Sequence, residues 1–311
     1  MKYILVTGAA GFIGAAVATF LLKKNRAVVT VDNLSTGDLD NIPNGCVFIE
    51  GDVSDVSVLA ELEKYDIDAI IHIAGQSSGE VSFSDPVYDL DTNTKSTLLL
   101  LKYARESGIE RFIYASTMSV YGGANEIVNE TMGVKPVSFY GVGKLASEQY
   151  LEIFSKYKIR CTSLRFFNVY GPGQNMENMQ QGMASIFLSQ AIKNNKIIVK
   201  GSGERYRDFI YIDDVVTSVI ACLESMKDGH EVINVGTGIK TKVKDLISEI
   251  QNIFDDELDI IYHGSTEGDV HGIVADNARL MTKVSGGYKF TSVRDGLRKM
   301  ANWAQQKPND S

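Results

Sequence analysis

Residues 3–14 read YILVTGAAGFIG, a short apolar strand that runs directly into three glycines and the start of a helical pattern. Gly8, Gly11 and Gly14 fall at the turn between the strand and the helix. Glycine there lets backbone amides and a helix N-terminus approach a pyrophosphate. An ordinary glycine-rich turn would give the same pattern, but the position directly after a strand favours a dinucleotide site.

The next β-branched run ends VVTVD, which places Asp32 18 residues after Gly14. An acid at this place accepts hydrogen bonds from a ribose 2′-hydroxyl and repels a 2′-phosphate. A turn aspartate before Asn33 is the alternative, but the order of strand, glycine turn, helix, strand and acid favours NAD over NADP. A third run ends EGDV and offers Asp52 and Val53 near the adenine, with a loop acid and a core valine as equal alternatives.

Short β-branched runs alternate with longer helical patterns through the first half of the chain, which is typical of a parallel sheet covered by helices on both faces. Strands are predicted at 3–7, 28–32, 46–50, 68–73, 110–116 and 160–166, and helices near 12–24, 55–64, 86–107 and 139–157. Strand-like runs at 209–212 and 232–235 follow, then helices near 242–254 and 292–305. The stretch GPGQNMENMQQGM after Tyr170 is predicted to be a mobile loop. We therefore expect a doubly wound α/β core and a looser C-terminal part.

Composition excludes several classes of protein. The 311 residues are 44% hydrophobic, which suggests about two globular domains, and 31 Lys and Arg against 39 Asp and Glu give a net charge of −8. Without a basic stripe nucleic acid is not an expected partner, and without an apolar run of about 20 residues or a secretory pattern we expect a cytoplasmic protein with no membrane association. Isolated cysteines and histidines without ligand spacing predict neither a disulfide nor a metal.

The sequence YGVGK places Tyr140 and Lys144 four residues apart, on one helical face. A free tyrosine has a pKa near 10, and an ammonium together with a positively charged nicotinamide would favour its phenolate. An exposed pair on an amphipathic helix is the alternative. Gly141 and Gly143 argue against it, because two glycines in one turn cost a helix roughly 2 kcal/mol and suggest that a cofactor or a strand comes close.

Hydroxyl groups gather at the end of the strand RFIYAS. The hydroxyl residues there are Ser116, Thr117 and Ser119. They lie at the carboxyl edge, where open α/β sheets bind ligands. Turn formation is the ordinary alternative for such residues.

The motifs TGAAGFIG, GDVSD, STMSVYG, YGVGK, RFFNVYGP and GERYRDFIYIDDV occur in the order and spacing of the extended short-chain dehydrogenase/reductase family, which the chain resembles over nearly its whole length. It looks most like the UDP-glucose 4-epimerase branch of the nucleotide-sugar epimerases and dehydratases. The resemblance implies a Rossmann-type doubly wound sheet in residues 1–168, to which 209–212 and 232–235 return. Residues 169–311 would form a smaller α/β domain, mainly substrate-binding.

The resemblance also implies roles for single residues. Tyr140 matches the catalytic base, Lys144 its nicotinamide-ribose partner and Thr117 the hydroxyl that shares the proton. The expected cofactor-binding residues are Gly8, Gly11, Phe12, Ile13, Gly14, Asp32, Asn33, Asp52, Val53, Ala74, Gly75, Asn93, Ser116, Tyr140 and Lys144.

On the substrate side, the resemblance assigns Asn168 and Arg207 to the diphosphate, together with Thr117 at the sugar. A salt bridge to Asp208 or another acid is the alternative role of Arg207. Ile273 matches the residue beside the sugar C2 substituent, where its size would admit an N-acetyl group; a core position in the strand-like GIVA is the alternative.

Two departures from the family pattern bear on function. Met118 and Ser119 stand where related dehydratases and decarboxylases carry acids, so elimination and decarboxylation lack their acid or base. Thr266 and His271 replace arginines that often hold the diphosphate. We therefore expect an NAD-dependent epimerase that inverts C4 of a nucleotide-diphosphate sugar, with UDP-hexoses or UDP-N-acetylhexosamines as substrates, through a 4-keto intermediate.

Two other functions stay open at this point. A nucleotide-sugar 4-ketoreductase would use the same residues with a dissociable NAD(P)H, and a non-catalytic NAD-binding module would need only the cofactor site. We also expect a homodimer through a four-helix bundle, because the helices near 86–107 and 139–157 carry more apolar surface, including Leu98 to Leu101, than one sheet face can bury.

Overall fold

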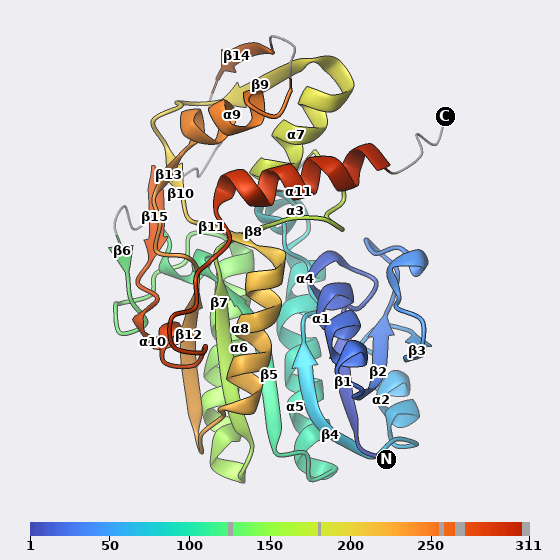
Figure 1. Cartoon of the computed structure of the whole chain (residues 1–311). Helices are drawn as coiled ribbons and strands as arrows, with labels where there is room; N and C mark the ends of the chain where they lie inside the picture. Colours follow the sequence, from blue (N-terminus) through green and yellow to red (C-terminus); the bar gives the residue numbers. More distant parts are fainter. Residues whose placement is uncertain (124–126, 180–181, 255–257, 265–270, 307–311) are drawn as a thin grey trace.

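A seven-stranded parallel sheet forms the centre of the protein (Figure 1). The structure is a computed structural model that describes all residues except 124–126, 180–181, 255–257, 265–270 and 307–311. The strands follow the order β12-β7-β5-β4-β1-β2-β3. They are β1 (Tyr3–Thr7), β2 (Ala27–Asp32), β3 (Val47–Glu50), β4 (Ile67–His72), β5 (Arg111–Thr117), β7 (Arg160–Phe166) and β12 (His230–Val235). The first six match the predicted strands to within one residue.

Helices cover both faces of this sheet because its strands are apolar on both sides. In β1, Ile4 and Val6 belong to one buried cluster and Leu5 to the other, as the alternation of a strand requires. The first face is covered by α1 (Phe12–Lys23) and α8 (Ile212–Glu224), and the second by α2 (Val56–Leu62), α5 (Ser96–Glu106) and α6 (Phe139–Phe154).

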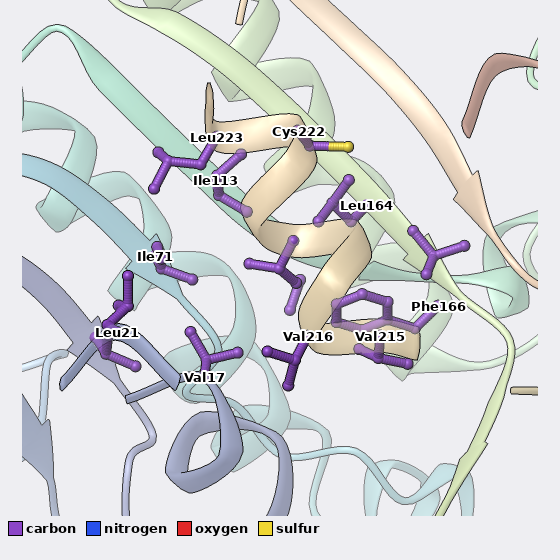
Figure 2. Packing of buried hydrophobic residues seen from close by; sticks show 14 of the residues in the cluster. Val17, Leu21, Ile71, Ile113, Leu164, Phe166, Val215, Val216, Cys222 and Leu223 are labelled. Carbon is purple, nitrogen blue, oxygen red and sulfur yellow. The ribbon is translucent and has the colours of Figure 1, made fainter. Parts of the chain in front are cut away.

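Figure 2 shows the first of these clusters, with Val17 of α1 and Val216 of α8 beside Ile71, Ile113 and Leu164 of the sheet. Each such side chain contributes about 1.5–3 kcal/mol when fully buried. The cluster thus joins a helix from the start of the chain to one from its second half.

Smaller sheets and further helices lie beyond the carboxyl ends of the seven strands (Figure 1). The strand order β13-β10-β15-β6 forms one sheet, and β11-β8 and β14-β9 form two-stranded sheets. Their bounds are β6 (Ile127–Val128), β8 (Asn168–Tyr170), β9 (Lys196–Lys200), β10 (Tyr206–Arg207), β11 (Phe209–Tyr211), β13 (Thr241–Lys242), β14 (Asp259–His263) and β15 (Gly272–Ala275). The helices here are α7 (Met183–Asn194), α9 (Val243–Gln251) and α11 (Val293–Gln306). The short α10 (Ala278–Met281) lies beside β12, with Leu280 in the cluster on the first face of the large sheet (Figure 1).

The predicted strand 209–212 does not return to the large sheet. Its first three residues form β11, which pairs with β8 in a separate two-stranded sheet, and Ile212 begins α8. A buried apolar run of this length has the same pattern in either sheet, so the sequence could not identify its partner. β12 does join the large sheet, beside β7. The predicted mobile loop after Tyr170 includes residues 180–181, which lie outside the described residues.

The predicted helix 86–107 is interrupted. After α3 (Gly79–Ser84) the chain forms α4 (Pro86–Leu90), a π-helical turn η2 (Asp91–Lys95) and then α5. Within this turn the carbonyl oxygen of Asn93 accepts hydrogen bonds from Ser147 Oγ of α6 at 2.8 Å and Thr97 Oγ1 at 2.9 Å. Since one of these partners comes from another helix, periodicity along the chain could not reveal the turn.

No helix in the described part of the chain is long and apolar enough to cross a membrane. Cys46, Cys161 and Cys222 carry free thiols. The described residues contain no group of three or more His, Cys, Asp or Glu side chains that could hold a metal ion.

Candidate active site

The glycine turn after β1 is built by close backbone packing. Gly8 has a φ of +73°, and a Cβ on it would lie 2.7 Å from the backbone nitrogen of Ala74, which itself donates to Thr7 Oγ1 at 3.2 Å. A Cβ on Gly14 would overlap the carbonyl oxygen of Gly8. Gly11 starts α1 without a side-chain cap, so the N–H groups of the first turn suit a phosphate. The turn therefore fits the predicted pyrophosphate site.

Phe12 and Ile13 have a different role from the three glycines. Both side chains are partly buried against the cluster formed by the C-terminal helices, and the Phe12 ring lies 3.5 Å from the position of a Cβ on Gly173. The predicted contact of these two residues with the cofactor can therefore use their backbone N–H groups in the first turn of α1.

Asp32 ends β2 with its carboxylate fixed by backbone donors. Oδ2 accepts from the Ala10 N–H and Oδ1 from the Leu34 N–H, both at 2.9 Å. Each carboxylate oxygen can accept a second hydrogen bond, so Asp32 keeps acceptor capacity for a ribose hydroxyl. This geometry is compatible with the predicted preference for NAD.

The residues predicted near the adenine divide into two groups. Asn33 Nδ2 donates to Asp52 Oδ2 at 2.7 Å, so the structure brings these two together. Burial alone would raise the pKa of Asp52, but hydrogen bonds from Ser54 and Asn33 hold it below its usual value. Val53 is 6% exposed and belongs to the core under the sheet, which is the alternative considered for it.

Tyr140, Lys144 and Thr117 converge at the carboxyl end of β5. Lys144 Nζ lies 5.8 Å from the centre of the Tyr140 ring and donates to the carbonyl oxygen of Ala115 at 3.0 Å. Thr117 lies close enough to the Tyr140 hydroxyl to lower its pKa, and its Oγ1 accepts from the backbone N–H of Ser119 at 3.1 Å. The structure thus brings the three predicted catalytic residues together.

Burial sets the proton affinities of this group. It raises the pKa of Tyr140 to about 12, although Thr117 acts in the opposite direction. It lowers the pKa of Lys144 to about 8, against the attraction of the Asp89 carboxylate. Lys144 by itself therefore does not make Tyr140 a base at neutral pH, and the predicted lowering depends on a further positive charge.

Gly141 and Gly143 are required by protein packing and not by a cofactor. A Cβ on Gly141 would lie 2.9 Å from the Pro136 Cβ and from the carbonyl oxygen of Ser119, and one on Gly143 would lie 2.9 Å from Thr94 Oγ1. The expectation of a close neighbour is thus correct for both glycines. The neighbour of Gly141 is a loop, and that of Gly143 is the π-helical turn.

Asn93 lies in this π-helical turn and is fully buried. Its Nδ2 donates to the carbonyl oxygen of Gln76 at 2.8 Å and to Asp89 Oδ1 at 3.0 Å, while its Oδ1 has no hydrogen-bond partner among the described residues. A Cβ on Gly75 would overlap this Oδ1 and lie 3.2 Å from Lys144 Nζ. A buried acceptor beside an exposed glycine and an ammonium fits a ligand hydroxyl, as a nicotinamide ribose would provide.

Sequence reasoning missed Asp89 and Gln76. Asp89 is 1% exposed and accepts a hydrogen bond from Gln76 Nε2 at 2.7 Å. The available signal was an acid four residues before Asn93, which a helix places on the same face.

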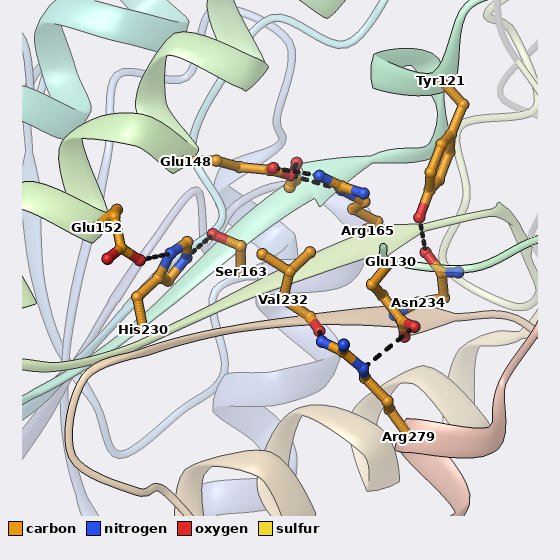
Figure 3. Close-up of polar contacts among 11 residues, drawn as sticks. Tyr121, Glu130, Glu148, Glu152, Ser163, Arg165, His230, Val232, Asn234 and Arg279 are labelled. Atoms are coloured by element: carbon orange, nitrogen blue, oxygen red, sulfur yellow. Dashed lines mark hydrogen bonds and ion pairs between the residues drawn. The ribbon is translucent and has the colours of Figure 1, made fainter. Parts of the chain in front are cut away.

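Ser116, which was expected to bind the cofactor, uses its hydroxyl group within the protein. Its hydroxyl donates to Glu148 Oε1 of α6, which also receives Arg165 Nε of β7 at 2.9 Å. Figure 3 shows the Glu148–Arg165 pair. Successive side chains of a strand point to opposite faces, so Ser116 cannot share the direction of Thr117.

Asn168 lies beside the catalytic residues at the start of β8. Its Nδ2 donates to the carbonyl oxygen of Asp208 at 3.0 Å and lies 3.7 Å from the sulfur of Met118, the residue after Thr117.

Arg207, on β10, is 6% exposed, and its Nη1 donates to the carbonyl oxygens of Tyr206 at 2.8 Å and His271 at 3.4 Å. Burial, helped by nearby Arg205, lowers the pKa of its guanidinium to about 10. The Asp208 carboxylate accepts from Thr237, Gly238 and Ala275 instead, so the described residues show no salt bridge between Arg207 and Asp208, one of the acids considered above.

Ile273 is a core residue in the structure. It is 2% exposed on β15, opposite Arg207 of β10, and packs in a cluster with Val120 and Phe167. Its expected role as a wall of the sugar pocket is therefore replaced by the alternative, a position in the core. The apolar GIVA run fits both roles. His271 is exposed, with its ring 5.5 Å from that of Tyr206, and Thr266 lies outside the described residues.

Comparisons with known proteins agree with this geometry. Residues 4–236 match the model of the NAD dependent epimerase/dehydratase family. The chain is 34% identical over 304 residues to a putative UDP-glucose 4-epimerase of Methanocaldococcus jannaschii, covering 96% of this chain and 97% of that protein.

Two solved structures are similar over almost all of both chains. UDP-glucose 4-epimerase from Thermotoga maritima, with UDP-glucose, is 31% identical with a TM-score of 0.92, covering 98% of this chain and 99% of that chain. The Thermus thermophilus enzyme, complexed with NAD, is 28% identical with a TM-score of 0.90, covering 99% and 100%. The chain, with its glycine turn, Asp32 and the group of Tyr140, Lys144 and Thr117, therefore belongs to the NAD dependent epimerase/dehydratase family.

Proposed function

We propose that the protein is an NAD-dependent 4-epimerase of nucleotide-diphosphate sugars, with a UDP-hexose or a UDP-N-acetylhexosamine as its substrate. The observation that carries the proposal is the convergence of Tyr140, Thr117 and Lys144 at the end of β5, with Lys144 Nζ 5.8 Å from the centre of the Tyr140 ring. Asp32 supplies the acceptor for the adenosine ribose, and Gly8, Gly11 and Gly14 leave room for the pyrophosphate.

Tyr140 is the proton acceptor in this mechanism. Its phenolate oxygen takes the proton of the sugar C4 hydroxyl while the C4 hydrogen leaves with its electron pair, which yields a 4-keto sugar. Bound NAD supplies the hydride acceptor and, with its oxidised ring, the positive charge that favours a phenolate. Thr117, which lies near Tyr140 at the end of β5, would hold the C4 oxygen through its hydroxyl group.

Inversion requires that the keto sugar presents its other face. The hydride and the proton on Tyr140 then return to C4 and its oxygen, so that the reaction has no net redox change. General-base removal of the hydroxyl proton is worth roughly 10² to 10⁴ in rate.

Dehydration of the sugar is not proposed, although the family includes dehydratases. Met118 is partly buried against the small cluster around Ile273, and Ser119 donates its backbone N–H to Thr117 at 3.1 Å. Neither side chain can protonate a leaving hydroxyl or remove the C5 proton.

The C-terminal part, residues 169–311, would bind most of the nucleotide-diphosphate. Arg207 is the expected diphosphate ligand, because it carries a buried guanidinium on β10, in the C-terminal part of the chain. An anion would restore the pKa that burial lowers.

We also propose a homodimer through α4, α5 and α6. Large apolar side chains are exposed on these helices: Val87 and Leu90 of α4, Leu98 of α5, and Phe139, Val142 and Ile153 of α6. Leu100 and Leu101, which the sequence analysis counted as surplus, are buried under the sheet. Pairing across a two-fold axis would form a four-helix bundle from α5 and α6. A monomeric mass by light scattering at micromolar concentration would refute it.

The substrate is tested with a panel of UDP-, TDP-, GDP- and CDP-sugars, including N-acetylated sugars and a uronic acid, with separation of the C4 epimers. Conversion of a UDP-sugar into its C4 epimer without added NADH supports the proposal. Consumption of added NADH or NADPH without epimer formation would instead indicate the 4-ketoreductase. NAD binding with no turnover of any sugar would indicate the non-catalytic module.

A further inference from the structure

A buried carboxylate beside the catalytic helix has no role in the mechanism above. Asp89 of α4 is 1% exposed, and none of the described cations lies within ion-pair distance of it. Its Oδ1 accepts hydrogen bonds from Gln76 Nε2 at 2.7 Å and Asn93 Nδ2 at 3.0 Å. Its Oδ2 lies 3.5 Å from the position of a Cβ on Gly143, at the start of α6. Asp89 thus joins the segment after β4, the π-helical turn and the helix that carries Lys144.

Asp89 decides which end of the Asn93 amide faces the site. A carboxylate only accepts hydrogen bonds, so the Asn93 amide must turn its nitrogen toward Asp89. Both N–H groups of that nitrogen are then used, by Asp89 Oδ1 and by the carbonyl oxygen of Gln76. The carbonyl oxygen of the amide is left beside Gly75 and Lys144, buried and without a hydrogen-bond partner among the described residues.

Asp89 is also the negative charge that acts on Lys144. Burial raises the pKa of Asp89, while the hydrogen bonds from Gln76 and Asn93 and the Lys144 ammonium act against that rise. Besides Asp89 of α4, the titratable groups around Lys144 Nζ are Tyr114 of β5, with its ring centre at 5.0 Å, Tyr140 of its own helix, and His72 of β4. Burial raises the pKa of both tyrosines and lowers that of His72 to about 3, so all three are neutral at neutral pH in the protein alone.

We propose that Asp89 is a positioning residue for the cofactor: through Asn93 it presents a carbonyl acceptor beside Gly75, and its charge holds the Lys144 ammonium at the same place. A nicotinamide ribose hydroxyl is the group that an acceptor and an ammonium would bind together. The proposal deepens the proposed function and rests on its use of NAD.

The test is the NAD dissociation constant of Asp89→Asn, measured by calorimetry from about pH 6 to 9. Asparagine has nearly the same shape as aspartate but carries no charge. With an amide nitrogen in place of a carboxylate oxygen, it no longer fixes the direction of the Asn93 amide. Without the carboxylate the pKa of Lys144 falls, by about one unit for a neighbouring charge of this kind. The pH above which NAD binding weakens should therefore be about one unit lower in Asp89→Asn than in the wild type. At pH 8 the variant should bind NAD about fivefold more weakly than the wild type does. The basic limb of the kcat/KM profile should move by the same amount.

Asp91→Asn is the matched control. Asp91 lies two residues away in η2, where it pairs with Lys95 at 3.6 Å, and its side chain is about half exposed, so its removal should leave the wild-type pH dependence. Asp89→Glu, which keeps the charge, should restore most of the wild-type pH dependence.

Asp89→Asn with the same pH dependence as the wild type would overturn the proposal, even if NAD binds more weakly at every pH, because a merely structural role would give that result. If Asp89→Asn does not fold, Asp89→Ser gives the same comparison. Binding of NAD is measured without sugar, so a wild type that binds NAD but epimerises nothing would refute the proposed function and leave the result on Asp89 standing.

Discussion

Replacing Arg165 by methionine breaks the ion pair that anchors the catalytic helix to the sheet. Arg165 of β7 donates to Glu148 of α6 through Nη2 at 2.6 Å and Nε at 2.9 Å, and both side chains are 4% exposed (Figure 3). Removal of Arg165 leaves the Glu148 carboxylate buried, with Ser116 as its only other hydrogen-bond donor among the described residues. Such a loss costs about 3–5 kcal/mol. For a chain of this length that corresponds to a decrease in Tm of roughly 6 °C.

Arg160→Met is the matched control, because Arg160 lies on the same strand and pairs with Glu110 at 3.1 Å at the protein surface. Its loss should cost no more than about 1 kcal/mol. In the double variant Glu148→Met/Arg165→Met, which removes both charges, most of the lost stability should return. Urea unfolding of the four proteins measures these differences. Equal losses for Arg165→Met and Arg160→Met would show that the buried pair does not stabilise the structure.

Three further predictions concern the cofactor, the base and the core. Asp32→Ala should weaken NAD binding more than NADP binding, because only the free 2′-hydroxyl loses an acceptor; equal losses in calorimetry would contradict the assignment. Tyr140→Phe should lower turnover by about 10² or more with NAD still bound, since the proton acceptor is gone, and near-normal turnover would exclude Tyr140 as the base. Ile273→Tyr should destabilise the protein by about 1–3 kcal/mol, because a larger ring must enter a filled core. A fully stable variant that loses only N-acetylated sugars would return Ile273 to the wall of the sugar pocket.

The parallel sheet could be predicted from the sequence because its strands are apolar on both faces and separated by helices of regular period. The glycine turn and Asp32 were predictable for the same reason, since they sit at fixed places on two of those strands. The shortest strands could not be predicted: β6, β10 and β13 have two residues each, too few to show a period.

The site was predicted less completely where its geometry depends on contacts between distant segments. The π-helical turn at Asn93 is held in part by Ser147 of α6, and the direction of Ser116 is set by Glu148. Asp89 lies beside the site only because the π-helical turn that follows it faces Gly143 of α6. Sequence spacing describes one element at a time and contains none of these contacts.

Transfer of the C4 hydrogen within the protein is the central claim, and a substrate labelled with deuterium at C4 tests it most directly. The wild type should convert the labelled UDP-sugar into its C4 epimer with the deuterium still at C4 and no NADH accumulating, as mass spectrometry and absorbance at about 340 nm would record. Loss of the deuterium to water, or accumulation of NADH in proportion to product, would contradict the account.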